Sequence, residues 1–384
     1  MHTHWLQQSG TFLRSREGRG TLLLAACSAI ALGVVPNLLE KAWDSGWFFA
    51  GVFVSTILLA VLGWVLRLPR GVGVVLQLFS PDAMQEGRLE ALKAASARNH
   101  SSTLLVKPRM LRPGRMDLPP RARMDLVASL IDARVIEDIG PDAGADGGAD
   151  VTLYPLAHLS DGFLLGQCLA DFRGYALTVM HVSGADGRTV VPGVVLDGSL
   201  AADLGPQREA LVRNRIDPTP GAGDVQPVPH PECPPEHQRR LALIVRLTGV
   251  DAMIDDACEV ARTGRVRRPS GGLHTGYVFD RADSEADGLP CGAHLVIRST
   301  GGRHLDESRD TFEAIAKHIH QTYVTARDAW KTACGGGSIE TRIFVAAPLP
   351  IVIALGYLMR HENAEVVHHD KDLLNKPVAS GVTS

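Results

Sequence analysis

Two long apolar runs open the chain. They cover residues 21–39 and 46–66, and neither contains a charged residue. Each has about 20 residues, which is enough for a helix to cross the hydrocarbon core of a bilayer. Trp43, Trp47 and Trp64 lie at the ends of these runs, where indole rings favour the headgroup level. The pattern predicts a hairpin of two transmembrane helices.

The charges that flank these runs predict its orientation. Three arginines precede the first run and two follow the second, whereas the connection 40–45 carries one lysine against two acids. Positively charged flanks stay on the cytoplasmic side, so we expect an inner-membrane protein with two spans and both termini in the cytoplasm.

Two other interpretations of the first seventy residues are less favoured. The tetrapeptide LAAC at residues 24–27 resembles a lipoprotein cleavage box, but only a few apolar residues precede Cys27, and the apolar run continues beyond it. The two runs could also form the buried core of a soluble protein. Two consecutive charge-free runs with aromatic ends argue against that.

From residue 72 onward, apolar runs of strand length alternate with stretches of helical periodicity, which is typical of a parallel α/β sheet. In the first half the expected strands are residues 72–79, 102–108, 175–182 and 189–196, and the expected helices are 80–97 and 123–136. In the second half the expected strands are 241–248, 293–300, 341–347 and 364–370, and the expected helices are 251–264, 306–330 and 351–359.

The predicted organisation therefore has five parts. In chain order these are a cytoplasmic segment (1–20), the membrane hairpin (21–70), a first Rossmann-like half (71–200), an irregular connection rich in proline and glycine (201–236) and a second Rossmann-like half (237–384).

A third apolar run, RIFVAAPLPIVIALGYLM at residues 342–359, raises the question of a further membrane span. Pro348 and Pro350 prevent one continuous helix across it, and the unbroken apolar stretch is too short to cross a bilayer. We expect a buried strand, a turn and a helix packed on the sheet, with Gly356 permitting close backbone approach.

Composition narrows the range of functions. The formal net charge of the 384 residues is −3, so no overall basic field attracts long nucleic acid. The P-loop, G-x-G-x-x-G, H-E-x-x-H and G-x-S-x-G motifs do not occur in a suitable context, and the six cysteines include no C-x-x-C pair. His230, Cys233 and His237 have no second ligand pair nearby, so we expect no metal, cofactor or catalytic residue.

The C-terminal part resembles a known family. An apolar strand, the turn AAP at residues 346–348, a helix containing Gly356 and the final strand EVVHHD resemble the C-terminal signature of SAVED domains. The likeness covers roughly residues 72–376, but a recognisable motif is present only in residues 299–370. SAVED domains consist of two fused Rossmann-like halves, each similar to the CRISPR-associated Rossmann-fold (CARF) sensors.

Two spans ahead of such a domain resemble the transmembrane effectors of CBASS, the bacterial anti-phage systems that signal with cyclic oligonucleotides. The resemblance implies a receptor for a cyclic di- or trinucleotide made by a partner nucleotidyltransferase. It also implies that ligand binding drives homo-oligomerisation and that the clustered spans then damage the inner membrane.

Chemistry independent of the family suggests where such a ligand would bind. Backbone amides at helix N-termini bind phosphates, and in parallel sheets these lie at the carboxyl ends of strands. The expected ligand-binding residues are Ser80, Lys107, Thr248, Gly249, Ser299, Thr300, Gly301, Gly302, Arg303, Ala347 and Pro348. The alternative is that STGG at 299–302 is an ordinary turn, and that Arg246 and Arg298 face solvent.

Two other classes of function remain open at this stage. One is a membrane-bound α/β enzyme that acts on nucleotides, which a titratable pair at the strand ends would favour. The other is a passive membrane scaffold.

Overall fold

In the computed structural model the chain divides into two compact units, residues 1–70 and 71–384. The residues described are 21, 23, 25, 28, 54–63, 71–79, 83–112, 118–139, 151–171, 176–184, 187–213, 215–219, 225–249, 252–264, 290–300 and 305–367. In the first unit, residues 54–63 are helical. Among the described residues, no helix combines enough length with enough apolar character to traverse a bilayer. The expected spans lie mostly outside these residues, so the membrane hairpin and its orientation stay predictions.

The first half of the second unit is a five-stranded sheet in the order β2-β1-β3-β4-β5. Its strands are β1 (Val72–Gln77), β2 (Ser102–Val106), β3 (Val151–Leu156), β4 (Leu177–Ser183) and β5 (Thr189–Leu196). The first four are parallel, and β5 is antiparallel to β4. The helices α5 (Ala83–Asn99), α6 (Pro120–Ile139) and α7 (Leu159–Leu169) follow β1, β2 and β3 in turn.

The second half repeats this arrangement. Its parallel strands are β8 (Arg240–Arg246), β9 (Ala293–Ser299), β10 (Glu340–Ala346) and β11 (Ala364–Val366), in the order β11-β10-β8-β9. The helices α9 (Ala252–Thr263), α10 (Arg309–Ala333) and α11 (Leu349–Leu358) follow β8, β9 and β10. Each half therefore has the strand order second-first-third-fourth, and the prediction of an α/β fold with two Rossmann-like halves is confirmed.

Several elements differ from the sequence-based expectation. The patterns above included neither β3 nor α7, although β3 lies at the centre of the first sheet. The connection 201–236, expected to be irregular, contains short elements. They include α8 (Pro206–Val212), β6 (Ile216–Asp217), β7 (Val228–Pro229) and two 3-10 turns, η4 (Gly198–Ala201), which begins just ahead of it, and η5 (Pro235–His237). Both β6 and β7 pair with β9, so this connection completes the second sheet.

The apolar run at residues 342–359 forms β10 and α11. Its helix is almost wholly buried, with Ile351, Ile353 and Ala354 at 0% exposure. The prediction of a buried strand, turn and helix is therefore confirmed. The predicted apolar face of α10 is confirmed as well, because Phe312, Ile315, Ala316, Ile319 and Tyr323 are all fully buried.

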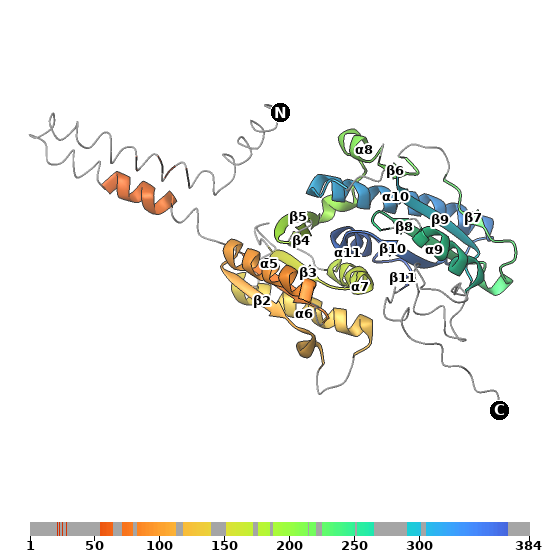
Figure 1. Ribbon diagram of the computed structural model, residues 1–384, viewed down its shortest axis with the longest axis horizontal. Coiled ribbons are helices and arrows are strands. Elements are labelled where there is room, and N and C mark those ends of the chain that lie inside the picture. Colours follow the sequence, from red (N-terminus) through yellow and green to blue (C-terminus); the bar gives the residue numbers. More distant parts are fainter. Residues whose placement is uncertain are drawn as a thin grey trace, which may run out of the picture. The chain divides into compact units, whose positions relative to one another are not determined.

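The two halves meet where α7 packs against α11, as Figure 1 shows at the centre of the second unit. Gly166 and Gly356 each stand seven residues after the start of their helix. A Cβ on Gly166 would lie 2.0 Å from the carbonyl oxygen of Ile353, and one on Gly356 would lie 2.0 Å from that of Phe163. Phe163 and Ile353 are also equivalent positions, so the contact is reciprocal, as in a two-fold symmetric pair.

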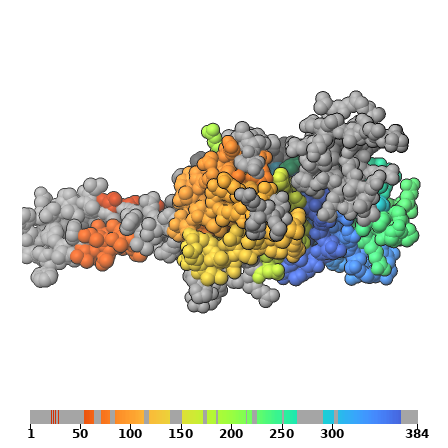
Figure 2. All heavy atoms as spheres, turned by 90° about the horizontal axis from the view of Figure 1, so that it is seen from below, coloured from red at the N-terminus to blue at the C-terminus, as the bar shows by residue number. Residues whose placement is uncertain are grey.

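Contacts along the whole length show that α7 and α11 run parallel. Near their N-termini, the space beside Gly162 is filled by Leu349. Beyond their C-termini, the guanidinium of Arg360 donates a hydrogen bond to the carbonyl oxygen of Ala170 at 3.0 Å. Both helices therefore begin on the same side of the molecule. Figure 2 shows the same unit turned by 90°, with the first half mainly in orange and yellow and the second half mainly in green and blue.

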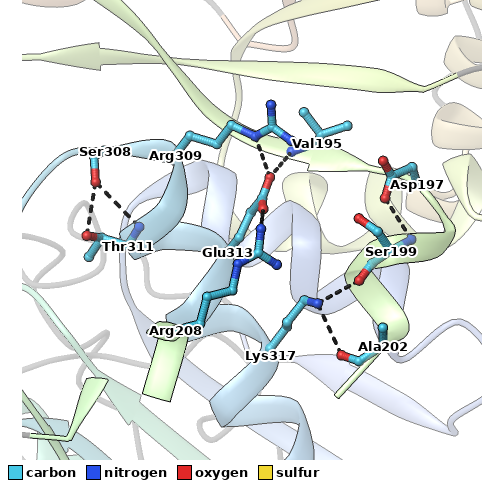
Figure 3. Close-up of polar contacts among 10 residues, drawn as sticks. All are labelled: Val195, Asp197, Ser199, Ala202, Arg208, Ser308, Arg309, Thr311, Glu313 and Lys317. Carbon is cyan, nitrogen blue, oxygen red and sulfur yellow. Dashed lines mark hydrogen bonds and ion pairs between the residues drawn. The ribbon is translucent and has the colours of Figure 1, made fainter. Parts of the chain in front are cut away.

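Buried charges on α10 tie the second half to the first (Figure 3). Glu313 accepts hydrogen bonds from the backbone N–H of Val195 at 3.1 Å and from Arg208 and Arg309 at 2.8 and 2.7 Å. One turn further on, Lys317 donates to two carbonyl oxygens of the η4 segment, at 2.6 and 3.1 Å. Glu313 and Lys317 are only 2–3% exposed, and both charged groups have hydrogen-bond partners.

We predict that Gly356→Ala lowers the free energy of unfolding by about 3 kcal/mol, because its methyl group forces two helix backbones apart. Gly87→Ala is the matched control. Gly87 lies inside α5 with open space around it, so alanine should raise stability by about 0.5–1 kcal/mol through helix propensity. Denaturant unfolding of the two variants and the parent, followed by circular dichroism, measures both. Equal stability of Gly356→Ala and the parent would contradict the close contact.

Candidate functional site

The carboxyl ends of three neighbouring strands of the second sheet gather most of the predicted ligand-binding residues. The strands β10, β8 and β9 end in register, with Arg246 paired to both Ala346 and Arg298. The residues at and beyond these ends are Ala347, Pro348, Thr248, Gly249, Ser299 and Thr300. The backbone N–H groups of Leu247 and Thr248 both donate to the carbonyl oxygen of Ala346, at 2.8 and 3.0 Å. These bonds join the ends of β8 and β10 into one platform.

The members of this platform differ in accessibility. Thr248, Gly249 and Thr300 are exposed, whereas Ser299 and Ala347 are buried. Gly249 has a φ of +82°, a conformation that favours glycine over residues with a side chain. Thr248 and Thr300 thus present their side chains at the surface at the end of the sheet, while the buried members shape its backbone.

The remaining predicted residues are less central. Lys107 follows β2, an edge strand of the first sheet, and its side chain is exposed. Lys107 therefore lies at the carboxyl edge of the first sheet, whereas the six residues above lie at the carboxyl edge of the second sheet. Ser80, Gly301, Gly302 and Arg303 lie outside the described residues, so their roles stay predictions.

The α7 and α11 N-termini bring the two carboxyl edges together. His158 is the N-cap of α7 and Pro348 that of α11, and neither side chain accepts a hydrogen bond from its helix backbone. Because the helices run parallel, their N-termini lie side by side. Each N-terminus carries a partial positive charge of about half a unit, so the pair favours an anion in front of it.

The two helix ends are not electrostatically equal. In the first turn of α7, the buried carboxylate of Asp161 accepts a hydrogen bond from Arg123 of α6. The equivalent position in α11 is Ile351, and the first turn of α11 contains no acid. The N-terminus of α11 therefore keeps its full preference for an anion, whereas α7 begins with a neutralised pair.

Two arginines that the sequence analysis did not select flank the end of β9. Arg246, the last residue of β8, is half-buried and donates to the carbonyl oxygen of Ser299 at 3.3 Å. Arg215 precedes β6, and its carbonyl oxygen accepts a hydrogen bond from the N–H of Thr300 at 2.9 Å. Its Nη1 atom is buried without a hydrogen-bond partner among the described residues. Arg298, by contrast, is exposed and pairs with Asp217 at 3.3 Å, so the solvent-facing interpretation holds for it.

An aromatic pair stands at the corresponding edge of the first sheet. The rings of Phe79, just beyond β1, and His158 lie with centroids 4.5 Å apart and planes inclined by 32°. His158 is exposed and Phe79 half-buried. The sequence analysis missed both residues. Phe79 was expected as the last residue of the strand 72–79, which gave no functional signal, and the strand before His158 was itself missed.

A titratable pair links the two halves near the same edge. His181 of β4 and Glu307, which lies just ahead of α10, approach with Nε2 and Oε1 3.6 Å apart. Burial lowers the pKa of His181, and the negative charge of Glu307 only partly opposes this. Glu307 also accepts a hydrogen bond from the N–H of Gly184 at 3.2 Å. The imidazole is therefore neutral near pH 7, beside a carboxylate that is held by backbone and side-chain donors.

The residues considered as metal ligands form hydrogen bonds instead. His230 places Nε2 2.7 Å from Nδ1 of His294 and Nδ1 2.8 Å from the carbonyl oxygen of Cys291. His237 contacts Arg240 through Nδ1 at 3.0 Å. Among the described residues, no three histidine, cysteine or acidic side chains converge as they would around a metal ion. Burial, together with the neighbouring His230, lowers the pKa of His294 to about 4.

Comparison with known proteins gives limited similarity. No family model matches this chain, and no curated protein matches it. Two structures of the Acinetobacter baumannii Cap4 SAVED/CARF-domain containing receptor, with the cyclic trinucleotides 3′3′3′-cAAA and 2′3′3′-cAAA, are similar to it at 10% and 11% identity, with TM-scores of 0.38 and 0.36. Each alignment covers 82% of this chain and 52% of the receptor, so this chain spans about half of that receptor's length.

The histidine pair gives the protein a pH-dependent stability. The pKa of His294 is about 4 in the folded chain, against about 6.5 when unfolded, so the unfolded chain takes up a proton first as pH falls. We predict that the free energy of unfolding decreases from about pH 7.5 to about pH 5, and that His294→Gln flattens this decrease. His361→Gln, which changes an exposed histidine, should behave as the parent does. Urea titrations across this range test it, and an unchanged slope for His294→Gln would refute the assignment.

Proposed function

We propose that this chain is a membrane-anchored receptor for a cyclic oligonucleotide, of the SAVED class. Ligand binding drives the cytoplasmic units to oligomerise, and the clustered membrane spans then disrupt the bacterial inner membrane in anti-phage defence. The chain acts as a sensor and not as an enzyme. Its partners are the ligand, the lipid bilayer and further copies of itself.

The observation that carries this proposal is the parallel packing of α7 and α11. It places two helix N-termini side by side at the carboxyl edges of two sheets of equal topology. A cyclic oligonucleotide is itself a ring of repeated units with several phosphates. A site built from two repeated halves, with two helix N-termini side by side, matches the repetition of such a ring, and the α11 N-terminus, which has no acid in its first turn, favours a phosphate.

The side chains at this edge suit the same ligand. Arg246 supplies a guanidinium at the end of β8, and the exposed hydroxyl groups of Thr248 and Thr300 can donate to phosphate oxygens. The net charge of −3 leaves no general attraction for polyanions, so selectivity for a compact phosphate ring comes from this local group of donors.

The first unit supports a membrane anchor. Residues 54–63 are helical and belong to the second predicted span. Six of their large apolar side chains are 37–63% exposed, namely those of Val54, Ile57, Leu58, Leu59, Val61 and Leu62. So many exposed apolar side chains within ten consecutive residues are unfavourable in water and favourable in lipid.

Membrane damage requires several copies, because one two-span hairpin is too small to enclose an aqueous pore. Spans associate through close packing of small residues without a hydrophobic drive, so isolated hairpins associate weakly. Assembly of the cytoplasmic units around ligand raises the local concentration of spans to about the millimolar range and shifts that balance. The resting protein is therefore harmless, and the ligand acts as the trigger.

One observation favours the alternative of an enzyme acting on nucleotides. His181 and Glu307 form a titratable pair near the strand ends, as a general base and its orienting carboxylate would. However, the ring of His181 packs edge-on against the buried ring of Phe312, with centroids 5.2 Å apart. Such packing is typical of a histidine with a structural role. Mass spectrometry of the ligand after incubation with the protein separates the two functions, because a receptor returns it unchanged.

We predict that a cyclic oligonucleotide raises the melting temperature of the full-length protein, since ligand at a hundred times Kd adds about 2.7 kcal/mol to its stability. Arg246→Gln should weaken binding about tenfold or more, because a charge-assisted hydrogen bond to phosphate is lost. Gln77 occupies the equivalent position of β1, so glutamine is compatible with the fold there. Arg298→Gln, on the neighbouring strand, is the control and should bind like the parent. Equal loss in both variants would remove Arg246 from the site.

Membrane disruption is tested with liposomes that carry the full-length protein and a self-quenched dye. We expect leakage only after cyclic oligonucleotide is added, and we expect it to rise more than linearly with protein density because several copies cooperate. A fragment of residues 71–384 should bind ligand but cause no leakage. If the full-length protein binds ligand at every density and never releases dye, the spans serve only as an anchor.

A further inference from the structure

The aromatic pair at the edge of the first sheet has a defined structural origin. Strands β1 and β3 are neighbours in register, and the N–H of Leu78 donates to the carbonyl oxygen of Leu156 at 3.0 Å. Phe79 directly follows Leu78, and His158 stands two residues after Leu156. Their rings consequently lie against each other, with centroids 4.5 Å apart.

Phe79 is the fixed member of the pair and His158 the accessible one. Phe79 packs against the apolar cluster between the first sheet and α5, which includes Val75, Leu92 and Tyr154. His158 has extended backbone geometry, with φ −67° and ψ 155°, and its side chain does not cap α7. The residue is exposed. An exposed ring therefore rests on a ring that the core immobilises.

The second half lacks this pair, although its backbone is the same. The N–H of Leu247 donates to the carbonyl oxygen of Ala346 at 2.8 Å, just as Leu78 does to Leu156. The residues that follow are Thr248 and Pro348, in place of Phe79 and His158. The two-fold symmetry of the backbone is thus broken by side chains, with an aromatic pair at one end and hydroxyl and guanidinium groups at the other.

Both ends lie close to the paired helix N-termini. His158 is the first residue before α7, and α7 runs beside α11 from its first turn. A ligand whose phosphates face the helix ends would therefore have a base within reach of His158. Aromatic side chains bind nucleobases by stacking, in a manner that tolerates any base. Histidine is among the residues that stack on unpaired bases.

Resting on the proposed function, we infer that His158, backed by Phe79, is the stacking platform for one nucleobase of the cyclic oligonucleotide. The site therefore holds its ligand in one orientation. One base stacks at the edge of the first sheet, and the phosphates lie toward Arg246 at the edge of the second. A ligand with unequal bases is bound in one register, because only one of the two equivalent positions offers an aromatic ring.

The test uses the full-length protein and three variants, His158→Ala, His158→Phe and His361→Ala. The probe is whichever of cyclic di-, tri- and tetraadenylate binds the parent, measured by isothermal titration calorimetry. Loss of one base stack should weaken binding about 5- to 150-fold in His158→Ala. His158→Phe keeps a ring and should bind within about threefold of the parent. His361→Ala removes an exposed histidine elsewhere and should bind as the parent does.

A spectroscopic arm separates stacking from a structural role. The same ring carrying one 2-aminopurine should lose fluorescence on binding the parent and His158→Phe, but not on binding His158→Ala. Full-strength binding by His158→Ala overturns the platform and leaves the proposed function standing. Weak binding by both His158→Ala and His158→Phe also overturns the platform, because that result shows that the imidazole acts through a hydrogen bond and not by stacking. If no cyclic adenylate binds the parent, the proposed function fails and this inference fails with it.

Discussion

The close contact of α7 with α11 is the constraint on which the rest of the second unit depends. At Gly166 and Gly356 the two helix backbones approach so closely that no Cβ fits at either position. Such an approach is possible only with glycine, and it occurs at equivalent positions of two repeated halves. Because the contact is reciprocal and the helices run parallel, it sets the relation between the two sheets. The carboxyl edges of both sheets consequently face the same side.

Side-chain charges reinforce that relation away from the centre. Glu313 and Lys317 of α10 lie at the junction with β5 and the connection, and each is fully buried yet paired. Removing one partner of such a group leaves an uncompensated buried charge, which typically costs about 3–5 kcal/mol. The group is therefore better suited to specifying one arrangement of the halves than to adding net stability. A rigid arrangement is what a site shared by two halves requires.

The repeated backbone and the unrepeated side chains have different consequences for recognition. The backbone supplies two helix N-termini and two matching strand ends, and these suit a ring of phosphates without reference to its bases. The side chains differ between the halves, with Phe79 and His158 on one side and Thr248 and Arg246 on the other. A duplicated fold thus provides the general affinity, and divergence of the copies provides the means to orient an unsymmetrical ligand.

The sequence by itself determined the elements whose local pattern agrees with their final surroundings. The amphipathic period of α10, the two prolines that divide the run at 342–359 and the apolar strands β1, β8 and β10 were sufficient to predict an α/β fold with two halves. The sequence also indicated the strand ends at which Thr248, Ser299 and Pro348 lie. These features depend on residues close together in the chain, so periodicity and turn chemistry reveal them.

Only the tertiary structure decided the centre of the molecule. Pro155 lies inside β3, a central strand, where a missing N–H argues locally against a strand. Gly162 and Gly166 lie inside α7, where they lower helix propensity. Both elements form because their neighbours bury all of β3 and most of α7, and the same glycines allow α7 to reach α11. Long-range packing outweighs local preference at this point, so the sequence pattern missed the two elements that bring the halves, and with them the candidate site, together.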